Sequence, residues 1–156
     1  MKIEKHKDAS LPRLPGKRVA LIVARFYDDL ADMLESGARH GLAACGVHDA
    51  QIECFAVPGC FEIPLAAKSA LERGFDAAVA LGVVIRGHTP HFEYVAGECA
   101  HGIMEVQLAA GKPIGFGILT CETRAQAEER SDPYRGNKGY DAAVAAMQVL
   151  ALTQPA

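Results

Sequence analysis

The repeated change between two hydrophobic periods is the feature that most constrains how this chain can fold. Four short apolar runs have the character of buried strands: 18–24, 51–57, 77–85 and 113–119. After each run, apolar residues recur at helical spacing. A chain that alternates strands and helices in this way forms a parallel sheet with helices on both faces. We therefore predict a three-layer α/β/α sandwich around a four-stranded parallel sheet.

Capping signals indicate where the helices begin. Thr123 and Gln126 have the spacing of a capping box, and Asn137 is the expected cap of the last helix. Thr89 is expected to cap the helix over approximately 90–106, with Pro90 at the first helical position. The expected helical stretches are approximately 30–45, 61–73, 90–106, a stretch from 123 onward, and 137–150.

The domain organisation is simple. Residues 1–17 are polar, hold Pro12 and Pro15, and are expected to form an extended N-terminal arm. Residues 18–156 are expected to form a single domain. The chain holds 27 alanines and 15 glycines, and only 6% of it is aromatic. Such a chain can bury one core, but it leaves little sequence to wall in a large substrate.

Composition excludes several classes of protein. The formal net charge is −3, whereas nucleic-acid-binding domains are basic. No uncharged apolar run reaches the ~18 residues of a membrane span, and the N-terminus lacks the apolar stretch of a secretory signal. The five cysteines are odd in number and form no CxxC motif, which is typical of reduced thiols. We expect a soluble, cytoplasmic protein.

Polar and aromatic side chains concentrate in the loops that follow the predicted strands. The carboxyl ends of parallel strands are where such sheets bind ligands. The residues at these positions that suggest a site are Phe26, Glu62, Arg86, His88, His91 and Glu122.

The loop after the third strand has the strongest indications of chemistry. The free backbone N–H groups in the first turn of the helix that Thr89 caps would bind an anion. Arg86 or a distant arginine could complete a phosphate site there. His91 would lie in the first turn, where a neutral imidazole can transfer protons near pH 7. The spacing is equally compatible with His88 and His91 being ordinary surface residues. No cysteine or carboxylate pair completes a metal site with them.

Three other residues allow two interpretations each. Phe26 could pack in the core or stack on a ligand where the first strand leaves the sheet. Cys60 could be an activated thiolate at a helix start, although a small residue chosen for fit is the favoured interpretation. Glu62 at an apolar helix start is costly unless it caps the helix or binds a polar ligand. No dinucleotide-binding or P-loop motif is present.

Six motifs in register resemble the 6,7-dimethyl-8-ribityllumazine synthase family, over about residues 18–151. They are ARF at 24–26, VPGCFEIP at 57–64, LGVVIRGHTPHFEYV at 81–95, PIGFGILT at 113–120, AEER at 127–130 and GNKG at 136–139. The resemblance implies a flavodoxin-like fold and a reaction that needs no cofactor or metal. In that reaction 5-amino-6-(D-ribitylamino)uracil condenses with 3,4-dihydroxy-2-butanone 4-phosphate, and phosphate and water are released.

The resemblance also implies roles for individual residues. His91 is the proton-transfer residue, and Phe26 stacks on the pyrimidine. Glu62 binds a ribityl hydroxyl, and Arg130 is the charged partner of the phosphate. The other implied substrate-binding residues are Cys60 and Phe61 beside Glu62, Val83, Val84 and Ile85 at a strand end, His88 and Thr89 in the phosphate loop, Phe116 from an adjacent subunit, and Lys138 close to the site.

The chain departs from the family pattern at several positions. Tyr27 stands where Asn is common, Cys60 where Ala is usual, His88 where Ala, Glu or Ser is common, and Val83 where Thr is common. The turn 131–135 replaces a small, glycine-rich segment. None of these changes removes a group that the implied mechanism needs.

Assembly and partners are further expectations from the resemblance. The family builds pentamers, with active sites between subunits, that stay alone, pair as decamers or close into sixty-subunit shells. An N-terminal arm of this kind adds a strand to a neighbouring sheet, and riboflavin synthase is a candidate partner. One alternative is a non-catalytic lumazine- or flavin-binding relative. A second is a phosphate-responsive domain with acceptors at Asp28 and Asp29.

Overall fold

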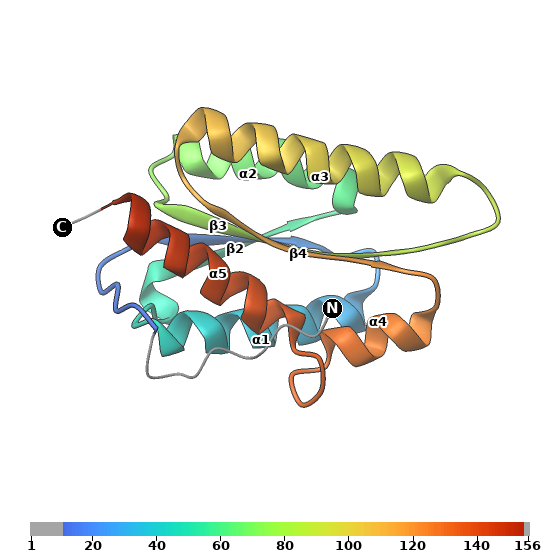
Figure 1. Cartoon of the computed structure of the whole chain (residues 1–156), viewed down its shortest axis with the longest axis horizontal. Coiled ribbons are helices and arrows are strands. Elements are labelled where there is room, and N and C mark those ends of the chain that lie inside the picture. The colour runs from blue at the N-terminus through green and yellow to red at the C-terminus, as the bar shows by residue number, and fades with distance from the viewer. Residues whose placement is uncertain (1–10, 155–156) are drawn as a thin grey trace.

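The computed structural model describes residues 11–154 and contains a four-stranded sheet and five α-helices (Figure 1). Two short 3₁₀ helices, η2 and η3, flank the second strand. In chain order the elements are β1 (Val19–Ala24), α1 (Asp28–Ala44), η2 (Asp49–Gln51), β2 (Ile52–Val57), η3 (Cys60–Glu62), α2 (Ile63–Glu72), β3 (Ala77–Ile85), α3 (His91–Ala110), β4 (Ile114–Cys121), α4 (Arg124–Ser131) and α5 (Lys138–Thr153).

The sheet is parallel throughout, with strand order β2-β1-β3-β4. This order is that of a flavodoxin-like sheet, and the three-layer prediction is confirmed. Helices α2 and α3 cover one face, and α1, α4 and α5 cover the other (Figure 1). Because all strands run the same way, the loops that leave their carboxyl ends meet at one edge of the sheet.

The core is divided by the sheet into two clusters. Leu21 and Leu81 pack with Leu34 of α1 and Met147 of α5 on one face. On the other face, Ile22 packs among residues of α2 and α3. The central strand β3 is buried along almost its whole length, which explains why its bounds agree with the predicted run 77–85.

Glycine and alanine let the helices of one face approach closely. A Cβ on Gly139 of α5 would lie 2.1 Å from the carbonyl oxygen of Leu34 in α1. A Cβ on Gly115 of β4 would lie 2.3 Å from the carbonyl oxygen of Ala142. Part of the small-residue content is therefore explained by close packing of α5 on α1 and β4.

The capping predictions are partly wrong. Pro90 rather than Thr89 is the N-cap of α3, and the Thr89 hydroxyl accepts a long bond of 3.4 Å from the N–H of His91. Asn137 is the N-cap of α5, but with φ of 51° it makes no side-chain cap bond. Its buried Oδ1 has no hydrogen-bond partner in the described structure and lies against Gly37. Because the backbone of Asn137 is left-handed, its side-chain amide lies against α1 and not against the first turn of α5.

Other boundaries shift by a few residues. The Thr123 hydroxyl accepts from the N–H of Gln126 as predicted, but the Gln126 amide oxygen accepts from the N–H of Glu122 instead of Thr123. Strand β4 continues to Cys121, two residues beyond the predicted run 113–119.

The predicted arm falls mostly outside the described residues, which begin at Leu11. Residues 11–17 form neither helix nor strand. Leu11 and Leu14 pack against the α1 side of the core, and the N–H of Leu14 donates to Cys45 O at 2.8 Å. No helix in the described range 11–154 is long and apolar enough to cross a membrane.

Candidate active site

A cavity of about 590 Å³ lies at the carboxyl edge of the sheet. It brings together eight of the thirteen predicted site residues: Phe26, Cys60, Phe61, Glu62, Val83, Val84, Ile85 and His91. The other lining residues are Tyr27, Pro58, Gly59, Tyr94 and Val95. The segments that follow β1 and β2, the end of β3 and the first turns of α3 therefore converge on one hollow.

Phe26 presents its ring to this cavity. It directly follows β1 and remains 71% exposed, so the alternative of a core residue is wrong. Its ring meets that of Tyr27 edge to face, with centroids 4.9 Å apart and planes at 74°. The contact with Tyr27 limits the freedom of an aromatic ring that is otherwise open to solvent.

Cys60 forms part of the cavity floor but is not an activated nucleophile. The thiol is buried, and a Cβ on Gly82 would lie 2.6 Å from its sulfur. A hydrogen bond with Cys99 of α3, together with burial, raises the pKa of Cys60 far above its ordinary value. The thiol therefore stays protonated, and the interpretation of Cys60 as a small, closely fitted residue is the one the structure supports.

Glu62 brings a free carboxylate to the cavity. It ends η3 and occupies the N-cap position of α2, yet its side chain makes no capping bond. No group within residues 11–154 donates a hydrogen bond to it. Of the two interpretations, capping is excluded, and the carboxylate remains able to accept hydrogen bonds from a ligand.

The end of β3 offers free backbone groups to the cavity. Pairing of β3 with β1 stops at Val23↔Leu81, whereas pairing with β4 continues to Ile85↔Cys121. Over residues 83–85, one side of β3 therefore has no strand partner in the described structure. Its N–H and C=O groups can form hydrogen bonds with the edge of a planar heterocycle, because unpaired backbone groups require partners.

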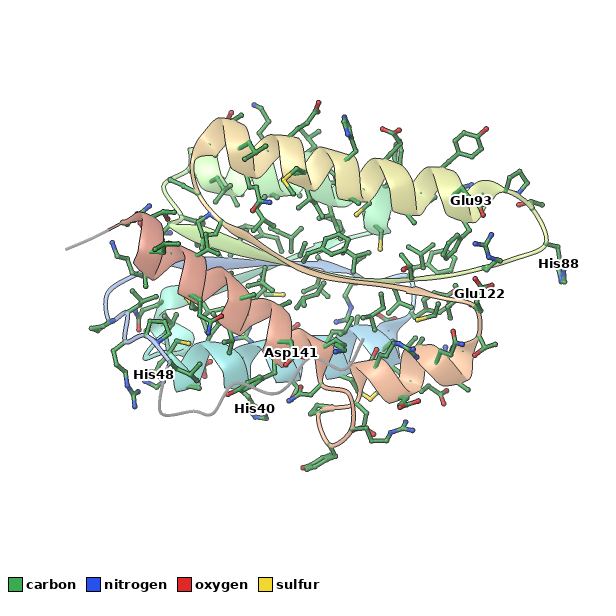
Figure 2. The ribbon with its side chains drawn as sticks, in the orientation of Figure 1. His40, His48, His88, Glu93, Glu122 and Asp141 are labelled. Atoms are coloured by element: carbon green, nitrogen blue, oxygen red, sulfur yellow. The ribbon has the colours of Figure 1, made fainter. Side chains whose placement is uncertain are left out.

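His91 is the first residue of α3 and lines the cavity. His88 and Thr89 do not line it, and His88 projects away from the body of the molecule at the tip of the loop (Figure 2). The two histidines are thus separated, and only His91 faces the cavity. In the described range no three His, Cys, Asp or Glu side chains are grouped to hold a metal ion.

Three further predicted residues lie outside the cavity. Phe116 is 51% exposed in the middle of β4, opposite Ala80 and away from the cavity lining. Lys138 pairs with Asp141 at 3.4 Å at the start of α5. Arg130 of α4 donates to the carbonyl of Gln126 at 3.2 Å and has no carboxylate partner among the described residues.

Arg130 nevertheless lies at the same edge of the sheet as the cavity. Burial raises the pKa of the Cys121 thiol at the end of β4, and the positive charge of Arg130 partly opposes this shift. Arg130 therefore lies close to the loops around the cavity, and residues 11–154 provide no acidic partner for it.

The predicted site omitted five lining residues: Tyr27, Pro58, Gly59, Tyr94 and Val95. Tyr94 and Val95 follow His91 by three and four positions, a spacing that places them on the same face of a helix. That spacing could have identified them once His91 was chosen.

A parallel, flavodoxin-like sheet with an aromatic ring, a free carboxylate and an imidazole around one edge cavity defines a class of small-molecule enzymes. Comparison with known proteins narrows the class. The family model for 6,7-dimethyl-8-ribityllumazine synthase matches residues 16–154, and the chain belongs to this family.

Two curated relatives carry the same name. The protein from Xanthobacter autotrophicus is 50% identical over 152 residues, covering 93% of this chain and 90% of the relative. The protein from Desulfatibacillum aliphaticivorans is 49% identical over 140 residues, covering 89% of this chain and 90% of the relative. The chain is thus similar to these relatives over nearly its whole length.

Proposed function

We propose that this chain condenses 5-amino-6-(D-ribitylamino)uracil with 3,4-dihydroxy-2-butanone 4-phosphate to give 6,7-dimethyl-8-ribityllumazine, phosphate and water. The supporting observation is the convergence of Phe26, Glu62 and His91 on the unpaired end of β3 in one cavity. Family membership gives the reaction, and the cavity provides groups suited to both substrates.

The pyrimidine occupies the part of the cavity between Phe26 and the end of β3. The exposed Phe26 ring stacks on the heterocycle, and backbone groups of Val83, Val84 and Ile85 bind its edge. Glu62 accepts a hydrogen bond from a ribityl hydroxyl, with Cys60 and Phe61 forming the adjacent wall.

The phosphate lies over the loop that precedes α3. The free N–H groups of the helix start and the partial positive charge of its dipole favour an anion there. His88 and Thr89 belong to this loop, and Arg130 approaches from α4 as the charged partner. Lys138 stands farther off, at the start of α5.

The chemistry begins when the 5-amino group attacks the ketone and forms a Schiff base with loss of water. Elimination of phosphate, ring closure and loss of a second water complete the lumazine. His91 transfers protons during these steps. Amine and ketone react readily by themselves, so most of the rate enhancement comes from holding the two substrates in the correct orientation.

The site is completed by a neighbouring subunit in a homo-oligomer built on pentamers. Phe116 is the aromatic residue that one subunit contributes to the cavity of the next. Helix α3 supports such an interface, because in its 20 residues only Cys99 and Ile103 are buried within the single chain. The assembly works in the cytoplasm, where riboflavin synthase would use its product.

A direct assay tests this proposal. The purified chain is incubated with both substrates while lumazine absorbance and fluorescence are recorded. Product formation supports the enzyme, whereas tight binding of lumazine without turnover would indicate the non-catalytic relative.

A further inference from the structure

We propose that Arg86 is a positioning residue that fixes the loop 87–90, which precedes α3 next to the cavity, and is not itself a phosphate ligand. The inference rests on the proposed function and concerns how its phosphate loop is held. Sequence reasoning offered Arg86 as one possible partner of the phosphate, so the two roles are direct alternatives.

Arg86 joins three elements through its side chain and backbone. Its Nε donates to both carboxylate oxygens of Glu122, at 3.1 and 2.9 Å, in the turn after β4. Its terminal nitrogen forms an ion pair with Glu93 in the first turn of α3. Its backbone N–H donates to the carbonyl of Cys121 at 2.9 Å. Figure 2 shows Glu93 at the start of α3 and Glu122 beyond the end of β4.

The guanidinium is also packed against an aromatic face. Its central carbon lies 4.4 Å from the ring centroid of Phe92. Two carboxylates and one ring therefore restrain the side chain from three directions. A phosphate could reach Nε, or the terminal nitrogen that pairs with Glu93, only if these contacts were replaced.

The ion pair with Glu93 closes the loop that carries the proposed phosphate site. Within the loop itself, the Thr89 hydroxyl makes only the long bond to the N–H of His91. The N–H of Glu93 donates to Pro90 O at 3.1 Å. The ion pair between the Arg86 and Glu93 side chains thus spans the loop 87–90. Arg86 directly precedes this loop, and Glu93 lies in α3, two residues after His91.

The charge of this cluster opposes direct phosphate binding. One guanidinium faces two carboxylates, so the group carries a net negative charge. The hydrogen bond from Arg86 lowers the pKa of Glu93 below its ordinary value, and Glu93 is therefore ionised at neutral pH. Arg130, which has no acidic partner in the described structure, is the better candidate to bind the phosphate.

Charge-conserving variants separate the two roles of Arg86. Glu93→Asp and Glu122→Asp keep every charge but shorten the side chains that hold the guanidinium. If Arg86 positions the loop, each change raises KM for the phosphate substrate about two- to fivefold, as expected for losing an exposed ion pair. KM for the pyrimidine and kcat should change less than about twofold. If Arg86 instead binds the phosphate, releasing the guanidinium from its carboxylate partners leaves KM for the phosphate substrate unchanged or lower. That result would overturn the inference.

A matched control and a second readout complete the test. Glu72→Asp shortens the carboxylate side chain of a comparable exposed ion pair, with Lys68 on α2, away from the cavity. This variant should leave both KM values unchanged. Hydrogen exchange of residues 87–91 should accelerate in Glu93→Asp and not in Glu72→Asp. Equal exchange rates in the two variants would contradict the inference about Arg86. Failure of the wild-type chain to make lumazine would refute the proposed function, and the exchange measurement would still test the inference.

Discussion

His91 begins α3 and is the only histidine of residues 11–154 that lines the cavity. In the proposed reaction, the imidazole moves protons beside the reacting amine, while Phe26 and β3 orient the heterocycle. The carboxylate of Glu62 and the cation of Arg130 lack partners in the described structure and are therefore available to bind the substrates. At the scale of the residue, the proposed site combines one proton-transfer group with several groups that bind and orient the substrates.

Replacing His91 tests how much of the rate depends on proton transfer. We expect His91→Ala to slow turnover about ten- to thousandfold, or about 1.4–4 kcal/mol in barrier, because orientation of the substrates persists. Single-turnover kinetics of lumazine formation measure this loss. A decrease beyond about 10⁵-fold would show that acid–base chemistry dominates.

Arg130 should act on one substrate only. Arg130→Ala is expected to raise KM for the phosphate substrate about tenfold or more, because a charge-assisted bond to the phosphate is lost. KM for the pyrimidine should remain close to the wild-type value. Lys68→Ala removes an equal charge from α2 and serves as control. An unchanged KM for the phosphate substrate would exclude this role for Arg130.

The thiol of Cys54 gives a prediction about pH. It donates to Glu35 at 3.4 Å, and burial, followed by the charge of Glu35, raises its pKa from 9.0 to about 11. At pH 8 its thiolate is therefore about a hundredfold scarcer than that of an ordinary cysteine. Alkylation followed by peptide mass spectrometry should show a rate at Cys54 that still increases between pH 9 and 11. A rate that levels off near pH 9 would contradict the raised pKa.

At the scale of the element, contact between α1 and α5 depends on the absence of a side chain. Helix propensity alone predicts that Gly139→Ala stabilises α5 by about 1 kcal/mol. Because the added Cβ would collide with the carbonyl of Leu34, we expect instead a loss of about 2–3 kcal/mol in the free energy of unfolding. Chemical denaturation of the two proteins measures the sign. A more stable variant would show that the helices can separate without cost.

The sequence predicts elements well where local pattern and tertiary burial agree. Strand β3 is apolar throughout because it lies between two strands and under helices on both faces, and its predicted bounds need no correction. Asn137 is the N-cap of α5 as predicted, but its lack of a side-chain cap bond could not be predicted, because the amide oxygen lies against Gly37, which is distant in sequence. The pairing of Arg86 with Glu122 in the turn after β4 was not predicted either, because the two residues are 36 positions apart.

The cavity residues, too, could be predicted only where a local pattern in the sequence marks them. The lining residues in the predicted set come from motifs at strand ends, so the rule for parallel sheets locates them. Phe116, Arg130 and Lys138 lie on β4, α4 and α5, away from the cavity lining of the single chain. Their roles were implied by family resemblance alone and remain proposals.

At the scale of the whole molecule, one chain provides one part of the proposed site. The alanine and glycine content accounts for close packing inside the sandwich, whereas α3 keeps an exposed surface along most of its length. Large apolar side chains remain uncovered near this surface, including Leu65, Met104 and Leu108. We attribute this surface to contact between subunits arranged head to tail.

Mixed oligomers test whether the site is shared. His91→Ala and Phe116→Ala are each expected to be impaired, Phe116→Ala about tenfold. After joint unfolding and reassembly, random assortment in a ring places an intact His91 beside a neighbour's intact Phe116 in roughly a quarter of the sites. Activity of the mixture should therefore exceed that of either variant alone. A simple average of the two activities would show that Phe116 does not act across a subunit boundary.

The central claim is that the chain joins the two substrates and does not merely bind their product. The most direct measurement records lumazine absorbance and inorganic phosphate together after the wild-type chain is mixed with both substrates. The account predicts that both products rise in a one-to-one ratio, faster than in the protein-free mixture. Binding of lumazine with no phosphate released above the uncatalysed rate would contradict it.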